Sequence, residues 1–475
     1  MAFGFFKKSE VADTIFMGGK IYTHDPEYPW ADAVACKDGR ILEVGDYESL
    51  SGELEGKHTE VIDLNGRVML PGYMDTCGHP VLNAFKDSCL FLKQGSLEDI
   101  LTQISEYANH NLEAEILFGY GYDETILKDL EPEKTRAYLD EINNDKPMVI
   151  LGKSGFHCWI NTVAVETVKA AAEEDEVTAI TLPYLLGVLE PMDSEVIPET
   201  VPDNMKKYCE RGFTSVFDCG APDFFASAYQ NFLVHFYQEN LLKQRFFGSL
   251  LITRDVNAKS VMHKLSQYKT HCVELDHHIN FNTLKLVVDR TSEADSISKD
   301  NLRELCLEAG DKGFDIHIDA IGEDAVLDSV DALESTRSAG YRKNAFTVAY
   351  DQLPDSDDLE DTFTRQSISE TVLTYGVTED DWLCIKRANS VEEAVDMLTI
   401  DAAVQLGISD DFGSIARGKH ADFVIFDESP LEAKSLSDFK KLQSAMTVIN
   451  GQIVYDTEEN DWPELYSMLA LQQYE

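Results

Sequence analysis

In two places, residues two positions apart in the sequence both carry side chains that can bind a divalent metal ion. Cys77 and His79 form the first pair, and His317 and Asp319 form the second. Thiolate, imidazole and carboxylate groups are the ligands that zinc takes in proteins. Because residues two apart on a β-strand point to the same face, each pair on a strand would present both side chains on one side of a sheet.

Lys285 is a third residue of chemical interest, because it lies inside the apolar segment Leu284–Val288. An unpaired ammonium group is costly to bury, so a salt bridge to Asp289 or to a neighbouring strand is the favoured interpretation. His277 and His278 are adjacent and would face opposite ways on a strand, so we expect them to be surface residues.

The elements that would position these residues alternate between strands and helices. Short apolar segments suited to buried parallel strands are Pro147–Leu151, Ser215–Asp218, Leu284–Val288, Asp315–Ile318 and Phe346–Tyr350. Helical segments lie between them, namely Leu97–His110, Asn161–Glu174, Lys299–Lys312 and Glu323–Ser335. Repeated strand–helix units predict an α/β fold with a parallel sheet, and the length of 475 residues favours a TIM-like (β/α)8 barrel.

The barrel is predicted to be shortened near its C-terminal strands. Only about 40 residues separate Tyr350 from the helical stretch that begins near Val391, whereas two further strand–helix units are needed. Strand-like alternation with Asn-Gly and Asp-Gly turns marks both ends of the chain. We therefore expect a composite β-sandwich-like domain of residues 1–70 and 405–460, a barrel of residues 71–404, and a C-terminal tail of residues 461–475.

The composition is that of a globular protein with an acidic surface. Apolar residues make up 44% and charged residues 27%, which excludes a disordered or collagen-like chain. The net charge of −46 argues against binding to nucleic acids or to anionic membranes. The nine cysteines include no CxxC pair, so no disulfide framework is indicated. With no signal-peptide core and no apolar run of about 18 residues, a soluble cytoplasmic protein is expected.

Several motifs resemble those of the amidohydrolase superfamily, in particular the branch of the N-substituted formamide deformylases. The motifs are LPGYMDTCGHP (70–80), SGFHCWIN (154–161), HIDAIGEDA (317–325) and GSIARGKHAD (413–422). They span most of the chain and occur in the family's order. The resemblance implies a divalent metal site at the mouth of the barrel, where a metal-activated water hydrolyses a carbon–nitrogen bond.

The sequence departs from the family at positions that the resemblance assigns to metal ligands. Cys77 stands in place of the first histidine of His-x-His, and Asp319 stands in place of a later histidine. Tyr350 replaces a further ligand, and neutral tyrosine is a poor ligand for zinc. The resemblance therefore implies a mononuclear site at most, with one divalent ion, zinc being expected, held by Cys77, His79 and Asp319 with assistance from His317.

The resemblance also assigns roles around the metal. The general base is Asp381, in a short segment that partly matches the family's terminal motif. His157 and Trp159 are assigned to substrate binding, with packing as the alternative for both. Lys285 corresponds to a strand lysine that can be carboxylated to bridge two metals in related hydrolases, whereas the salt bridge described above is favoured here.

Two functional hypotheses follow from these observations. In the first, the protein is a metal-dependent hydrolase acting on a carbon–nitrogen bond of a small amide-like substrate. In the second, it is a catalytically inactive amidohydrolase homologue whose barrel serves as a binding or assembly subunit. A small-molecule substrate is the expected partner, without nucleic acid or membrane, and a homodimer is expected by analogy with the family.

Overall fold

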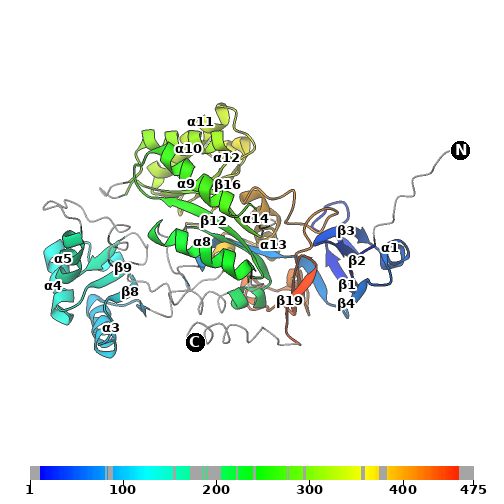
Figure 1. Cartoon of the computed structure of the whole chain (residues 1–475), viewed down its shortest axis with the longest axis horizontal. Helices are drawn as coiled ribbons and strands as arrows, with labels where there is room; N and C mark the ends of the chain where they lie inside the picture. The colour runs from blue at the N-terminus through cyan, green and yellow to red at the C-terminus, as the bar shows by residue number, and fades with distance from the viewer. Residues whose placement is uncertain are drawn as a thin grey trace.

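The fold is described from a computed structural model of the chain. The structure describes residues 11–80, 83, 89–152, 157–171, 185, 189, 205–220, 223–238, 242–273, 275, 278–291, 296–354, 359–373 and 382–458. Three β-sheets organise these residues: an eight-stranded sheet, a four-stranded sheet and a seven-stranded sheet. Figure 1 shows the seven-stranded sheet and its helices in the middle of the molecule, with the other two sheets on opposite sides of it.

The seven-stranded sheet carries the residues of chemical interest. Its strands are β6 (Tyr73–Gly78), β11 (Phe213–Asp218), β12 (Arg245–Ile252), β13 (Ile279–Asp289), β14 (Asp315–Ile321), β15 (Phe346–Ala349) and β16 (Ile368–Thr371). They pair in sequence order, and every neighbouring pair is parallel. The sheet is curled, so that its two edge strands approach each other. Sγ of Cys77 in β6 lies 3.2 Å from Oγ1 of Thr371 in β16.

The predicted α/β class with a curled parallel sheet is therefore confirmed. The described residues form a half-barrel, and no eighth parallel strand occurs among them. The predicted strand at Pro147–Leu151 does form, as β9 (Met148–Gly152), but it pairs in the four-stranded sheet instead.

Helices connect consecutive strands of the parallel sheet. They are α8 (Asp223–Gln238), α9 (Ala258–His271), α10 (Lys299–Lys312), α11 (Glu323–Ser338) and α12 (Leu359–Gln366). Helix α10 illustrates why they form: the Ser298 side chain accepts a hydrogen bond from the backbone N–H of Asn301, and Gly313 ends the helix with a φ of +76°. Its buried residues Leu302, Leu305, Cys306 and Ala309 recur at helical spacing and form the face that packs into the core.

The eight-stranded sheet combines strands from both ends of the chain. Its strands are β1 (Thr14–Tyr22), β2 (Trp30–Lys37), β3 (Arg40–Gly45), β4 (Glu60–Asp63), β5 (Val68–Pro71), β17 (Phe423–Phe426), β18 (Met446–Ile449) and β19 (Gln452–Asp456). Strand β5 pairs antiparallel with β17, which joins the two ends. Asn450 and Gly451 adopt positive φ in the turn between β18 and β19, as expected for an Asn-Gly hairpin. The domain boundaries at residues 70 and 405 stay a prediction, and residues 461–475 lie outside the described part.

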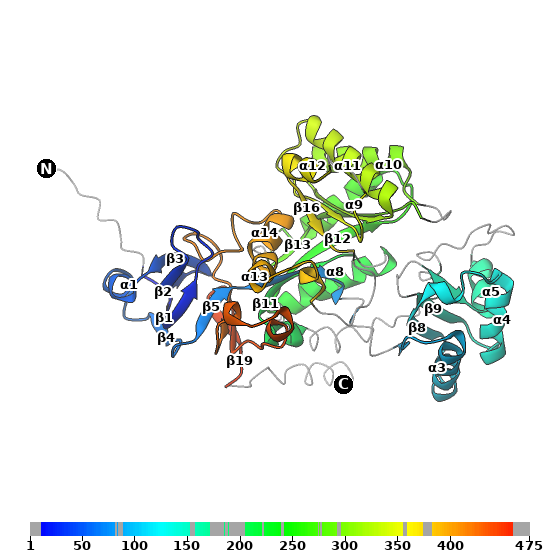
Figure 2. The ribbon, with the colours of Figure 1, turned by 180° about the vertical axis from the view of Figure 1, so that it is seen from behind.

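The four-stranded sheet is an additional unit between β6 and β11. It consists of β7 (Leu90–Phe91), β8 (Leu117–Tyr122), β9 and β10 (Cys158–Ile160), with helices α3 (Leu97–His110), α4 (Pro132–Ile142) and α5 (Thr162–Ala171). Figure 2 shows this unit at the end of the molecule opposite the β1–β4 region. The sequence did not distinguish these strands from those of the parallel sheet, because both kinds are short and apolar.

A buried ion pair connects the two larger sheets. Arg245, the first residue of β12, is fully buried, and its Nε and Nη2 donate to the Asp422 carboxylate at 2.6 and 3.0 Å. Nη2 also donates to Oδ1 of Asn450 at 2.6 Å and lies 3.1 Å from Nδ1 of His420. Asp422 and Asn450 flank strands of the eight-stranded sheet, so this network fixes that sheet against the parallel one.

Two buried histidines make the stability of this fold depend on pH. Burial, followed by the charge of Arg245, lowers the pKa of both His278 and His420 to about 4. In the unfolded chain each histidine binds a proton below about pH 6.5. The unfolded state therefore holds more protons between about pH 6.5 and 4, so the free energy of unfolding falls as the pH is lowered through this window.

We expect urea denaturation to give a smaller free energy of unfolding at pH 5 than at pH 7. The variant His278→Gln should show a smaller difference between the two pH values, because glutamine does not titrate and its amide can replace the 3.0 Å contact of Nε2 with the Leu242 carbonyl oxygen. An unchanged pH difference in this variant would mean that His278 is not a source of the effect. The prediction of His278 as a surface residue is wrong, since only 6% of it is exposed, and His277 lies outside the described residues.

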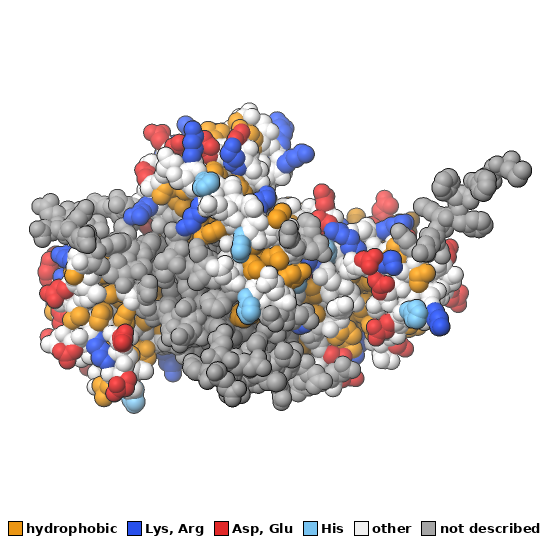
Figure 3. Space-filling model, viewed as in Figure 1, with side chains coloured by type: hydrophobic (Ala, Val, Ile, Leu, Met, Phe, Trp, Pro, Cys, Tyr) orange, Lys and Arg blue, Asp and Glu red, His pale blue; other side chains and the backbone are white. Residues whose placement is uncertain are grey.

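The surface carries both signs of charge. Figure 3 shows acidic and basic side chains interspersed over the face in view. Among the described residues, no helix is long and apolar enough to cross a lipid bilayer.

Candidate active site at the ends of the parallel strands

Strands β13 and β14 bring three ionisable side chains together inside the curled sheet. In the parallel register, Lys285 of β13 lies beside His317 of β14, and Asp319 follows two residues later on the same face. Nζ of Lys285 donates to Oδ1 of Asp319 at 2.6 Å. Nε2 of His317 lies 3.5 Å from the same oxygen. The predicted salt bridge of Lys285 to a neighbouring strand is thus confirmed.

All three side chains are withdrawn from water. The exposed fractions of the side chains are 1% for Lys285, 3% for Asp319 and 4% for His317. Burial opposes ionisation of Asp319, but Lys285 and His317 outweigh it and hold the pKa of Asp319 below its usual range. Burial, followed by the charge of Lys285, lowers the pKa of His317 to about 4. At neutral pH the site therefore holds an ammonium–carboxylate pair beside an uncharged imidazole.

The His317 ring is also fixed by packing. It stacks on the ring of Phe217 in β11, with the centroids 5.5 Å apart and an angle of 21° between the planes. The imidazole thus lies between an aromatic face and the Asp319 carboxylate, which leaves it little rotational freedom.

Cys77 and His79 lie at the end of β6. The Cys77 backbone N–H donates to Oδ1 of Asp75 at 3.0 Å, and its thiol contacts Thr371. Burial, followed by the charge of Asp75, raises the pKa of the Cys77 thiol to about 12, so the group is a thiol rather than a thiolate at neutral pH. Nδ1 of His79 lies 3.3 Å from the Gly220 carbonyl oxygen, directly after β11.

These positions allow a test of whether the predicted ligands fit a metal ion. Among the residues that the structure describes, no three His, Cys, Asp or Glu side chains gather closely enough to hold one. One oxygen of the Asp319 carboxylate, Oδ1, already accepts a hydrogen bond from the Lys285 ammonium. The zinc site therefore stays a prediction. As they lie, however, Cys77, His79, His317 and Asp319 do not fit a divalent cation.

The remaining predicted site residues lie elsewhere. Trp159 belongs to β10 and packs in the core of the four-stranded sheet, where its Nε1 donates to the Thr135 carbonyl oxygen at 2.6 Å. His157 precedes β10 and is exposed. Neither residue is brought into the Lys285 cluster by a described contact, and their substrate-binding roles stay predictions. Asp381, the predicted general base, lies outside the described residues.

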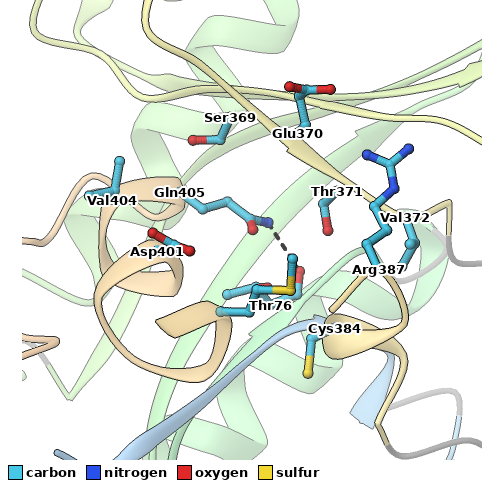
Figure 4. A pocket seen from close by; sticks show the side chains of 11 residues that line it. Thr76, Ser369, Glu370, Thr371, Val372, Cys384, Arg387, Asp401, Val404 and Gln405 are labelled. Carbon is cyan, nitrogen blue, oxygen red and sulfur yellow. Dashed lines mark hydrogen bonds between the residues drawn. The ribbon is translucent and has the colours of Figure 1, made fainter. Parts of the chain in front are cut away.

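A cavity of about 230 Å³ lies between the two edge strands of the parallel sheet. Its lining includes Thr76 of β6, the β16 residues Ser369, Glu370 and Thr371, and the side chains of Arg387, Asp401 and Gln405. Figure 4 shows Arg387 and Asp401 on opposite sides of the space, with Thr371 and Gln405 between them. Thr371 links the cavity to the cluster, because its hydroxyl contacts the Cys77 thiol.

Sequence reasoning missed the cavity residues. Arg387 places its guanidinium 3.9 Å from the centre of the Tyr350 ring, and the Tyr350 hydroxyl donates to Glu370. Burial, followed by Glu370, raises the pKa of Tyr350 to about 12. No local motif marks Arg387, Asp401 or Gln405, since the curling of the sheet brings β16 and the segment after it next to β6.

The fold and the site together indicate the class of protein. A parallel strand–helix sheet with charged side chains on its inner face is the arrangement of α/β enzymes that act on small molecules. Comparison gives the family: the amidohydrolase family model matches residues 60–369 and 355–455. The chain belongs to the amidohydrolase family.

Individual relatives agree with this assignment. The chain is 20% identical over 546 residues to an N-substituted formamide deformylase of Arthrobacter pascens, covering 94% of this chain and 99% of that protein. It is 22% identical over 541 residues to the putative amidohydrolase YtcJ of Bacillus subtilis, covering 93% and 99%. Both alignments are longer than the 475 residues of this chain, so both relatives contain residues without a counterpart here.

A solved structure supports the fold. An uncharacterised metal-dependent hydrolase of Pyrococcus horikoshii superposes with a TM-score of 0.62 at 16% identity, covering 90% of this chain and 99% of that one. At this identity the likeness concerns the fold alone.

Proposed function

We propose that the protein hydrolyses a carbon–nitrogen bond of a small, polar, amide-like substrate at the site formed by Lys285, His317 and Asp319. The observation that carries this proposal is the buried contact of 2.6 Å between Lys285 and Asp319 beside the His317 imidazole. Membership of the amidohydrolase family and the hydrolase fold support the reaction class. The residues themselves suggest how the reaction would be assisted.

Lys285 supplies positive charge for the step in which water attacks the substrate carbonyl. Attack converts the carbonyl oxygen into an oxyanion, and a fixed cation in a site shielded from bulk solvent stabilises that charge strongly. Asp319 holds the ammonium in place, so no reorganisation is needed as the charge develops. His317 is uncharged and accepts the proton of the attacking water at its imidazole. When the tetrahedral intermediate collapses, the imidazolium returns this proton to the leaving nitrogen, so that the C–N bond breaks and an amine and a carboxylic acid are released.

The zinc ion and the metal-activated water that the family resemblance implies form no step of this proposal. The predicted ligands do not fit a divalent ion as they lie, because the ammonium of Lys285 already holds the Asp319 oxygen. In this proposal Lys285 supplies the positive charge and His317 supplies the proton acceptor.

The cavity beside β16 is the proposed entrance for the substrate. Thr371 lines the cavity and its hydroxyl contacts the Cys77 thiol, and in this proposal their contact opens to let the substrate carbonyl reach Lys285. A guanidinium at one wall and a carboxylate at the other suit a molecule that carries polar or oppositely charged groups. The volume of about 230 Å³ limits the substrate to a small molecule.

A substrate panel tests the proposed function. Purified protein is incubated with N-formyl amines, N-acetyl amines, N-acyl amino acids and cyclic ureas, and the released amine is measured by mass spectrometry. We expect at least one polar class to be hydrolysed, with N-acyl amino acids favoured by the charged walls of the cavity. Absence of amine release from every class would speak for the alternative hypothesis, a catalytically inactive homologue that binds small molecules or assembles with a partner.

A further inference from the structure

A lysine lies among the residues expected to bind a metal. Lys285 is fully buried in the middle of β13, in register with Leu251 on one side and His317 on the other. Its ammonium reaches the carboxylate of Asp319, one of the predicted ligands. A buried ammonium is stable only with such a partner, so this contact is a requirement of the fold.

The imidazole of His317 approaches the same carboxylate oxygen as the ammonium. Oδ1 of Asp319 accepts a hydrogen bond from Nζ of Lys285 at 2.6 Å, and Nε2 of His317 lies 3.5 Å from the same oxygen. A metal ion bound by Asp319 through this oxygen would have to displace the lysine contact and to separate the imidazole from the carboxylate. Stacking on Phe217 restricts the movement of the imidazole.

Charge repulsion also opposes a metal ion at this position. Zinc binds carboxylate oxygens at about 2.0–2.2 Å. Because Nζ is 2.6 Å from the same oxygen, an ion at that distance would lie within about 5 Å of the ammonium. Two positive groups so close in a buried site repel each other strongly.

We infer that the Lys285 ammonium takes the place of a divalent cation, so that this member of the amidohydrolase family keeps its site assembled without a metal ion. The ammonium supplies the positive charge that neutralises Asp319 in the buried site. The inference does not rest on the proposed hydrolysis, since metal binding is measured without any turnover.

Zinc binding by the full-length protein tests the inference. The wild-type protein, Lys285→Met and the control Lys299→Met are each equilibrated with zinc chloride, freed of excess metal by gel filtration, and analysed for zinc per chain. Isothermal titration calorimetry with zinc chloride gives the affinities. Lys299 is a matched control because it is a lysine on the surface, paired with Asp328 and 57% exposed.

We expect no stoichiometric zinc in the wild-type protein or in Lys299→Met. In Lys285→Met the buried carboxylate of Asp319 loses its cation and becomes available beside His317. We therefore expect at least a tenfold gain in zinc affinity, which the second substitution His317→Ala reverses. Equal zinc binding by the wild-type protein and Lys285→Met would overturn the inference.

The wild-type protein alone keeps the inference testable if Lys285→Met does not fold. One zinc or manganese ion per wild-type chain, lost on His317→Ala or Asp319→Ala, would overturn it. A thermal midpoint that is the same in chelator and in excess zinc supports it, because an ion bound only by the folded state raises the midpoint.

Discussion

Replacing His317 by glutamine is expected to lower kcat/KM for the substrate found in the panel by about 100-fold to 10,000-fold, the usual contribution of a general base. His317 is the uncharged imidazole beside the Lys285–Asp319 pair, so it is a proton acceptor close to the fixed positive charge. Glutamine fills a similar volume but does not accept a proton from water at neutral pH. Since an uncharged side chain replaces an uncharged one, no buried charge is left without its partner.

His278→Gln is the matched control for this prediction. His278 is also a buried histidine with a lowered pKa, but it contacts the Leu242 carbonyl oxygen outside the cluster. We expect its kcat/KM to stay at the wild-type value at pH 7. Steady-state kinetics of the two variants and the wild-type protein, with circular dichroism to verify folding, give the comparison. Equal losses in both variants would show that the effect comes from a buried histidine in general and not from the site.

Arg245→Met is expected to lower the free energy of unfolding by about 3–5 kcal/mol, the range found when one partner of a buried ion pair is removed. Arg245 is fully buried, and the substitution leaves the Asp422 carboxylate without the two donors at 2.6 and 3.0 Å. The contacts with Asn450 and His420 are lost as well. Because these residues join the two larger sheets, both sheets should lose stability together.

Arg303→Met is the control for the role of burial. Arg303 forms an ion pair with Asp331 at 2.6 Å, but the two side chains are 44% and 46% exposed. Exposed pairs contribute about 0–1 kcal/mol, so we expect almost no change. Urea denaturation at pH 7 measures both variants. A loss under about 1 kcal/mol in Arg245→Met would show that the network does not hold the sheets together.

Local sequence patterns predicted the elements that depend on neighbouring residues. The Asn450-Gly451 turn adopts the positive φ values that this dipeptide favours. The alternation of strands and helices predicted the parallel sheet, because each strand and each helix is recognised from residues adjacent in the sequence. Lys285 was expected to pair with Asp289 or with a neighbouring strand on the ground that burial demands a partner, and Asp319 of the neighbouring strand β14 is that partner.

Features that depend on long-range pairing were not predicted. The strand at Met148–Gly152 was recognised, but its pairing in a separate four-stranded sheet depends on segments far along the chain. His278 looked like a surface residue, whereas it is buried against the Leu242 carbonyl oxygen across a loop. The cavity residue Arg387 has no local motif, since the cavity exists only once β6 and β16 approach each other.

Hydrolysis by the chelator-treated protein tests the central claim most directly, namely that the ionisable residues of the chain carry the reaction. Wild-type protein is dialysed against a strong chelator, and amine release is then measured with the best panel substrate in the presence of either chelator or zinc chloride. The arrangement of Lys285, His317 and Asp319 predicts equal rates under both conditions. A rate that disappears in chelator and returns with about one zinc ion per chain would contradict the account.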